Sequence, residues 1–407
     1  MPSCLYTARP RALVLALVVL AITAPTARAQ RLEPNPPATT KGRWRLSPVV
    51  ASETEFDNNV YLLSPGKRDD VGAPSTADEA SGRYTGMKSA SDVITTARGA
   101  LVIKGAGIGG QPLQITPAAA YEFYAINAER RNTTLRLSVE QELPRGSRAE
   151  FRARMTPSYF KRNYLADAVD ANGDGSIAPA ERVYAPAIYR ETGLSAAYRF
   201  RLDKSTKKSP FGAKLEFTAG YYGRVYDAPF AARDMSGPTA RASLFLDLTR
   251  RMALDLDYGF ESLSASPARE VMLLDEVDFG RDFNGNGSSN DVSARANELA
   301  DHSRREHSLG GTMRFDLPHR ATLAVAYAHV RRRNTSTEAY DVSNNGRRTS
   351  RNDFGAELGV RLTRDVRLTA AAETTGQSLN RTSDVAGTVD ETDYKRHRAK
   401  LRLSYEF

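Results

Sequence analysis

The residues best suited to chemistry lie in a short polar segment, where side chains carrying oxygen recur at every second position. Asp170, Asn172 and Asp174 are followed by Ser176 and, five residues later, by Glu181. Calcium takes six to eight oxygen ligands from carboxylates, amides, carbonyls and water. We therefore predict that Asp170, Asn172, Asp174, Ser176 and Glu181 hold a structural Ca²⁺ ion, with Ser176 contributing its main-chain carbonyl.

The same segment resembles the twelve-residue calcium loop of EF-hand proteins. Gly175 stands where that loop needs a sharp turn, Ile177 stands at its usual apolar position, and Glu181 can close the shell with two oxygens. Ala178 departs from the pattern because it offers no ligand, and Arg182 replaces the apolar residue that usually follows. The flanking residues alternate like strands, so we expect an isolated calcium loop or, alternatively, a polar turn.

A second segment repeats the beginning of this pattern. Asp282, Asn284, Asn286 and Ser288 have the required spacing, but Ser293 stands where the closing glutamate should be. We therefore predict a weaker second calcium site there, or else a plain flexible loop. In either segment a bound ion would offset the entropy lost when a long loop becomes ordered.

The remaining chemical motifs are weak. Gly105 to Gly110 fit the pattern G-x-G-x-x-G, but Gln111-Pro112 and a strand follow, whereas a dinucleotide site needs a helix there. We therefore expect a turn. The histidines show no metal-ligand spacing (His302, His307, His319, His329 and His397). His302 and His307 lie near acidic residues, as a hydrolase site at a barrel rim would require, but no convergent Ser/His cluster is visible. We therefore predict that the protein has no enzymatic activity.

The elements that must position these residues are indicated by a strict two-residue alternation. Between 354 and 362, one face carries Phe354, Ala356, Leu358, Val360 and Leu362, and the other carries Gly355, Glu357, Gly359 and Arg361. One apolar face and one polar face on every strand are typical of a barrel with lipid outside and water inside. After residue 30 no apolar run reaches the roughly 18 residues that a spanning helix needs.

This alternation predicts an all-β fold, a transmembrane antiparallel β-barrel of about 14 strands, with 12 to 16 as the range. The expected strands are 43–63, 91–105, 111–126, 131–143, 147–161, 184–202, 210–226, 238–249, 251–265, 304–317, 320–333, 349–363, 365–379 and 393–407. Short turns follow the even-numbered strands, whereas long polar loops follow many odd-numbered ones, notably 64–90, 162–183, 266–303 and 334–348. This parity puts both ends of the chain on the periplasmic side.

The beginning of the chain indicates export. Arg9 and Arg11 precede an apolar run from Ala12 to Ile22, and a small-x-small cleavage motif ends at Ala29. We predict a signal peptide over 1–29, a periplasmic lead-in over 30–42 and the barrel over 43–407. The single cysteine, Cys4, would leave with the signal, which excludes disulfides and cysteine chemistry in the mature chain.

Two strands resemble those of known bacterial outer-membrane barrels. The last strand alternates up to a terminal aromatic through Leu401, Leu403, Tyr405 and Phe407, like the signature by which the barrel-assembly machinery recognises its clients. The opening strand ends in Asp57-Asn58-Asn59-Val60, similar to the Asp-x-Asn-Val start of a porin-like family. This resemblance implies a Gram-negative outer membrane as location, with membrane lipid and lipopolysaccharide as surroundings, and it says little about cargo.

The polar face supplies the remaining functional indication. We expect the lumen to hold mixed charges that pair across strands, namely Arg136, Arg152, Arg154, Arg199, Arg201, Lys214, Arg361, Arg367 and Arg402 with Glu140, Glu216, Asp255, Asp257, Glu261, Glu357 and Glu373. The hypothesis is a porin-like barrel giving passive passage to small hydrophilic solutes. The alternative is a non-conducting surface binding or structural protein, favoured if loop 64–90 or 266–303 seals the lumen.

Net charge gives no support to a nucleic-acid partner. The formal charge is +9 for the full chain and falls to +6 without the three arginines of the signal peptide. This surplus is small and mixed with acids, which differs from the concentrated basic surface of a nucleic-acid-binding domain.

Overall fold

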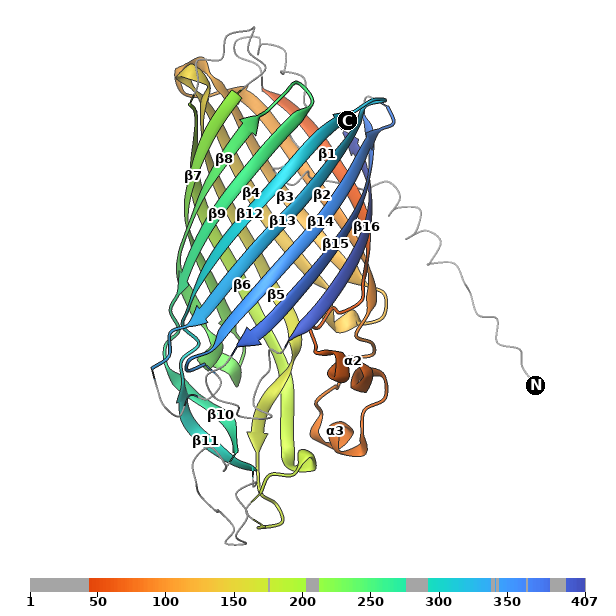
Figure 1. Cartoon of the computed structure of the whole chain (residues 1–407), viewed down its shortest axis with the longest axis vertical. Coiled ribbons are helices and arrows are strands. Elements are labelled where there is room, and N and C mark those ends of the chain that lie inside the picture. The colour runs from red at the N-terminus through yellow and green to blue at the C-terminus, as the bar shows by residue number, and fades with distance from the viewer. Residues whose placement is uncertain are drawn as a thin grey trace, which may run out of the picture.

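The chain forms a closed antiparallel β-barrel in a computed structural model, which describes residues 44–174, 176–202, 212–275, 292–337, 341, 344–363, 365–380 and 393–406 (Figure 1). Each barrel strand pairs with its sequence neighbour, and β1 pairs with β16 to close the ring. The fourteen barrel strands are β1 (Arg45–Asp57), β2 (Asp92–Ala106), β3 (Pro112–Tyr124), β4 (Asn132–Leu143), β5 (Ser147–Ala168), β6 (Arg182–Arg201), β7 (Gly212–Tyr226), β8 (Met235–Asp247), β9 (Met252–Leu263), β12 (Arg304–Leu317), β13 (Ala321–Asn334), β14 (Arg348–Arg361), β15 (Val366–Asn380) and β16 (Tyr394–Glu406). The predicted fold class and strand number are confirmed.

The alternation in the sequence explains which face each residue takes. On β13 and β14, Leu323 lies opposite Leu358, and Ala324 lies opposite Glu357, so the two faces keep separate chemistries along the pair. Large apolar side chains such as Phe56 and Phe354 are at least half exposed on the outer face. Exposed aromatic and aliphatic residues on every second position are stable only against an apolar surrounding.

The two ends of the barrel differ in the length of their connections. One end, here called the turn end, carries short turns such as Pro144–Gly146, in which Arg145 and Gly146 both adopt positive φ. The predicted glycine-rich turn also lies there, with Gly109 and Gly110 at positive φ. The other end, here called the loop end, carries the long connections, which lie at the bottom of Figure 1. The predicted alternation of short and long connections is therefore confirmed.

Two of the long connections contain structure that the sequence analysis missed. The segment 64–90 holds helices α2 (Pro65–Gly72) and α3 (Thr76–Ser81), and 266–303 holds the hairpin of β10 (Ala268–Asp275) and β11 (Val292–Ala300). Helix α3 begins because the Ser75 hydroxyl accepts the Asp78 N–H at 3.1 Å, and it ends at Gly82 in the left-handed region. These short elements carry too few periodic residues to stand out from a polar loop.

Some strand boundaries also need correction. β1 ends at Asp57 instead of residue 63, because the chain turns where the Asp57 carboxylate accepts the Asn59 N–H at 2.9 Å. β5 continues to Ala168 and β6 begins at Arg182, so the loop between them is 169–181 instead of 162–183. Bulges along β5 allow the longer strand pair to rise past the barrel end.

Several predictions fall on other parts of the chain. The signal peptide (1–29), the lead-in (30–42), Gly175, the second calcium-like segment and Phe407 all lie outside the described residues. Among the helices that are described, none has the length and apolar character needed to cross a membrane.

Candidate functional site in the barrel lumen

The inner face of the barrel carries the charged residues expected there. Strand register places Arg136 directly opposite Arg154 on one side and Ala118 on the other. It places Arg199 between Arg148 and Glu216. All predicted lumen residues on β4 to β7 share this inner face. The same holds for the residues on the later strands, including Asp255, Glu357, Glu373 and Arg402.

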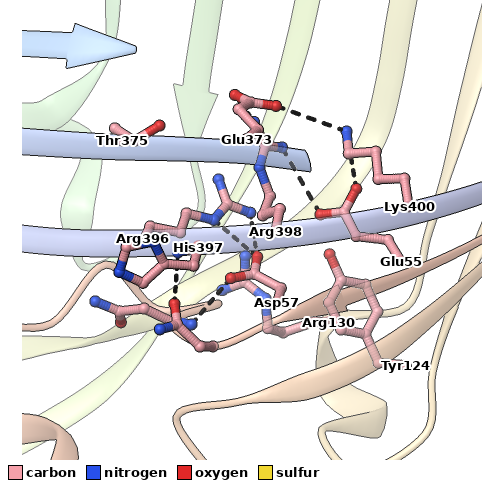
Figure 2. Close-up of polar contacts among 12 residues, drawn as sticks. Glu55, Asp57, Tyr124, Arg130, Glu373, Thr375, Arg396, His397, Arg398 and Lys400 are labelled. Atoms are coloured by element: carbon pink, nitrogen blue, oxygen red, sulfur yellow. Dashed lines mark hydrogen bonds and ion pairs between the residues drawn. The ribbon is translucent and has the colours of Figure 1, made fainter. Parts of the chain in front are cut away.

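On β1, β15 and β16 the charges form a ladder of ion pairs, and Figure 2 shows the part of it that contains Glu55, Asp57 and Glu373. Arg402 Nε lies 2.6 Å from a Glu53 oxygen, and Lys400 Nζ lies 2.9 Å from Glu55. Arg396 Nε donates to Asp57 at 2.8 Å, and the Asp57 side chain is fully buried. Because an unpaired buried carboxylate is expensive, the Asp57 carboxylate depends on its Arg396 partner for stability.

Further pairs line the wall between β6 and β12. Arg199 lies 2.7 Å from Glu216, and Arg314 of β12 lies 2.6 Å from Asp255. Glu216 and Asp255 are both buried. The prediction that lumen charges pair across strands is confirmed for these residues.

A different surface lines the inner face of β12 to β15. The register brings glycine and alanine together there, and we call this set the small-residue arc: Gly310, Ala324, Ala326, Ala328, Gly355 and Ala371. A cavity of about 710 Å³ lies against this arc. Charged side chains such as Arg241, Glu306 and Arg367 also line the cavity. The arc has almost no side-chain volume, so it leaves a space at this part of the wall. On the adjoining strands β16 and β1, the side chains of the ion pairs occupy the corresponding positions.

Residues 58–90 cover the β1–β5 side of the loop end. Tyr61 packs edge-on against Phe160 at 6.3 Å between ring centroids, within an apolar cluster that includes the inward-facing Ile94 and Tyr124. The segment is fixed at its start by Asn59, whose amide donates to the Leu63 carbonyl at 2.7 Å. The Asp-x-Asn-Val motif therefore has a local structural role in turning the chain into this cover.

The far end of this cover is fixed by a buried pair. Asp92 accepts both the main-chain and side-chain N–H of Asn127 at 2.8 Å, and the Asn127 oxygen accepts the Lys88 N–H at 2.9 Å. Asn163 of β5 donates to the carbonyl of Thr85 at 2.9 Å. These bonds hold 58–90 on one side of the opening and leave the small-residue arc uncovered by this segment.

Arg130 joins the cover to the barrel through three tyrosines. Its guanidinium lies 4.9 Å from the Tyr61 ring centroid, 5.6 Å from that of Tyr124 and 5.0 Å from that of Tyr159. Arg130 also donates to the Lys161 carbonyl at 2.6 Å. Sequence reasoning missed this cluster because its members come from four separate segments.

The predicted calcium residues form a compact loop at the loop end. Asp170 Oδ1 accepts the Gly173 N–H at 2.6 Å, and Asp174 Oδ1 accepts the Ser176 N–H at 2.8 Å. Hydrogen bonds from Ser176 and from the Asn172 amide lower the pKa of the Asp174 carboxyl below its ordinary value. Asp170, Asn172 and Asp174 therefore lie on one tight turn with their oxygens turned toward main-chain donors.

Glu181 folds back over the start of this loop, as a closing ligand must. Its Oε1 accepts the N–H groups of Ala171 at 3.0 Å and Asn172 at 3.3 Å. Within the part of the chain that the structure describes, no three His, Cys, Asp or Glu side chains converge on one metal-sized point. In this arrangement the carboxylates of Asp170, Asp174 and Glu181 accept main-chain N–H groups, and calcium binding by the loop stays a prediction.

A buried network at the loop end links two connections, the one between β7 and β8 and the one between β9 and β12. The Glu270 carboxylate of β10 lies 2.5 Å from Arg233 Nε and 2.7 Å from His302 Nε2. Burial raises the pKa of this carboxyl, but Arg233 and His302 together outweigh burial and lower it to about 2. His302, considered at first for a rim hydrolase, is therefore a structural partner of Glu270. No sequence spacing indicates this network, because each member lies on a different segment.

Comparison with known proteins gives only distant similarities. No protein-family model matches the chain, and no curated protein matches it. The outer membrane protein OprD from Pseudomonas aeruginosa aligns with a TM-score of 0.37 and 11% identity, covering 89% of this chain and 93% of OprD. An anion-selective porin from Comamonas acidovorans aligns with a TM-score of 0.35 and 10% identity, covering 90% of this chain and 99% of the porin. An outer membrane channel from Pseudomonas putida F1 aligns with a TM-score of 0.35 and 13% identity, covering 92% of this chain and 100% of the channel. Scores this low carry no conclusion about function, so the argument below rests on the barrel itself.

Proposed function

We propose that this barrel spans the outer membrane of a Gram-negative bacterium and gives passive passage to small hydrophilic solutes along the small-residue arc. The observation that carries the proposal is the cavity of about 710 Å³ against β12 to β15, lined by glycine, alanine and charged side chains. A wide polar cavity inside a barrel with an apolar exterior suits hydrated solutes.

The direction of insertion follows from the connections. Long loops face the cell exterior in barrels of this kind, whereas short turns face the periplasm. The proposed signal peptide and the C-terminal aromatic strand support export and assembly by the barrel-assembly machinery. The wall residues perform no bond-making chemistry in this proposal, so the protein would act without enzymatic turnover.

The proposal also includes calcium at the loop end. Asp170, Asn172, Asp174 and the Ser176 carbonyl would hold the ion, and Glu181 would complete the shell by exchanging its main-chain partners for the metal. The bound ion would stiffen a segment that packs beside α3 and, through Ile177, against Leu273 of β10. The segment 282–288 would be a second, weaker site.

A non-conducting surface protein is the second candidate, and the cover formed by 58–90 favours it. Single-channel recording from the purified, refolded protein in a planar bilayer separates the two. Channel function predicts stable current steps, whereas an inserted and folded barrel without current would contradict it. Adding a chelator should alter gating if the calcium loop borders the opening.

A further inference from the structure

Among the strand residues that the structure describes, the outer face of the barrel carries charge at the loop end. Strand register assigns the outward residues, and these include no Asp or Glu. Apart from histidine, the exposed outward cations are Arg190, Arg305, Arg331, Arg333, Arg348 and Lys395, all near the loop end. Half-buried Arg182 shares their face by register, on the part of β6 that rises past the barrel end. A lipid-facing surface with cations and no acids has no internal partner for its charge.

Four of these cations gather on three adjacent strands. Arg305 of β12 lies directly opposite Arg333 of β13, and Arg333 lies directly opposite Arg348 of β14. Arg331 lies one row nearer the barrel middle, opposite His307. We call Arg305, Arg331, Arg333 and Arg348 the arginine row. The loop-end tips of these three strands lie side by side in Figure 1.

The arginine row differs from the arginines next to it that face inward. Inward-facing Arg332 lies 2.9 Å from Glu306, and Arg304 lies 3.4 Å from Glu261. Within the described residues, no acid pairs with any member of the row. Like charges directly opposite one another on neighbouring strands destabilise a sheet. The row therefore opposes folding unless an anion from outside the chain lies between its guanidinium groups.

The surroundings of the row indicate its depth in a membrane. Aromatic side chains lie next to it on the side of the barrel middle. The ring centroids of Phe260 and His307 lie 5.2 Å apart, and those of Tyr327 and Phe354 lie 4.7 Å apart. Aromatic girdles mark the boundary between hydrocarbon and headgroups. The row thus lies at headgroup level, where the outer leaflet presents phosphate groups.

We propose that the arginine row binds the phosphate groups of lipopolysaccharide, the phosphorylated glycolipid of the outer leaflet. Guanidinium groups form paired, charge-assisted hydrogen bonds with phosphate, and several aligned guanidiniums match a lipid with two phosphates. The acyl chains would lie along the apolar outer wall below the row. This inference rests on the proposed outer-membrane location and adds a specific lipid site to it.

The test titrates the folded protein in detergent with bisphosphorylated lipid A and counts bound lipid by native mass spectrometry. The quadruple variant R305Q/R331Q/R333Q/R348Q should bind lipid A at least tenfold more weakly. The control variant R190Q/K395Q removes two outward cations elsewhere and should change binding less than twofold. Replacing the row by lysine should preserve most binding at low salt, because the charge remains.

Three outcomes would overturn the site. These are equal binding by the glutamine variant, equal binding of a phosphate-free glycolipid, and binding of inorganic phosphate alone as tight as that of lipid A. Heat-modifiable gel migration checks that each variant is folded. The channel proposal stays separately testable, because the glutamine variant should conduct like the wild type, and lipid binding in detergent needs no conductance.

Discussion

Two neighbouring stretches of the lumen wall have the same backbone and different side chains. On β16, β1 and β2, carboxylates such as the fully buried Asp57 are paired with arginine and lysine, and the cover 58–90 closes over them. On β12 to β15, glycine and alanine leave a cavity of about 710 Å³. The difference teaches that, within one barrel, the positions of small residues decide where space is left in the lumen, and our proposal places the solute path there.

The largest effect is expected from filling the small-residue arc. In A326W an indole would project into the cavity from β13, and the single-channel current should fall to less than about one fifth of wild type. The matched control is A356W, which places the same side chain on the outer face, since Ala356 lies opposite Val325. Equal currents in A326W and wild type would show that solutes do not pass along this arc.

On the packed side, the main effect should be on stability. D57A leaves the Arg396 guanidinium without its buried partner and removes the bond to the Asn59 N–H. Breaking a buried ion pair costs about 3 kcal/mol or more, so the free energy of unfolding in urea should fall by about that amount. D365A removes an exposed carboxylate at a turn and should change it by less than about 0.5 kcal/mol. If D57A leaves the free energy of unfolding unchanged, the ion pairs of the ladder do not stabilise the barrel.

Acid should release the β10–β11 hairpin before it unfolds the barrel. The pKa of Glu270 is about 2 in the folded protein against an ordinary 4.5. A lowered pKa means that the stabilisation is complete above about pH 4.5 and is lost as pH falls toward 2. The loss is on the order of 3 kcal/mol, measured as lower hydrogen-exchange protection factors of the hairpin, which remove the intrinsic pH dependence of exchange.

The variant E270Q removes the titrating carboxyl, so protection of the hairpin against exchange should already be weak at pH 7 and nearly independent of pH between 5 and 3. The matched control E79Q changes a glutamate of α3 and should keep the wild-type pH profile. If the protection factors of the wild-type hairpin stay the same between pH 5 and 2.5, the proposed role of the network is contradicted.

The smallest effect concerns calcium. At a Ca²⁺ concentration ten times its Kd, binding should add about 1.4 kcal/mol to the local stability of 169–181. Hydrogen exchange with Ca²⁺ and with a chelator measures this, and D170N/E181Q should abolish the difference. The control S75A alters the cap of the adjoining helix α3 and should leave the calcium response intact. No response in the wild type would exclude the calcium proposal.

The repeated features of this fold were predictable from the sequence. A two-residue alternation predicts strand 304–317 with the bounds that the structure gives, because a closed sheet between lipid and water imposes that period along its whole length. The same logic placed Arg199 and Glu216 on the inner face. The alternation also places Gly310, Ala326 and Gly355 on one face, but only strand register brings them together as one arc.

The features at the loop end were less predictable. Arg130 meets Tyr61, Tyr124 and Tyr159, and Glu270 meets Arg233 and His302, through contacts between separate connections. Such contacts obey no period, so each residue looks like an ordinary polar loop residue in the sequence. The calcium-like motif could be recognised in the sequence because all its residues lie within twelve positions, and calcium binding there stays a prediction.

The most direct test of the account uses single cysteines, since the only natural cysteine, Cys4, can be omitted with the proposed signal peptide. A326C lies on the small-residue arc, and the matched A197C lies buried on the inner face of β6. Current through each barrel is recorded before and after a charged, membrane-impermeant thiol reagent is added. Our account predicts a prompt and large change for A326C and little change for A197C. Equal responses, or block through A197C alone, would contradict a path along the small-residue arc.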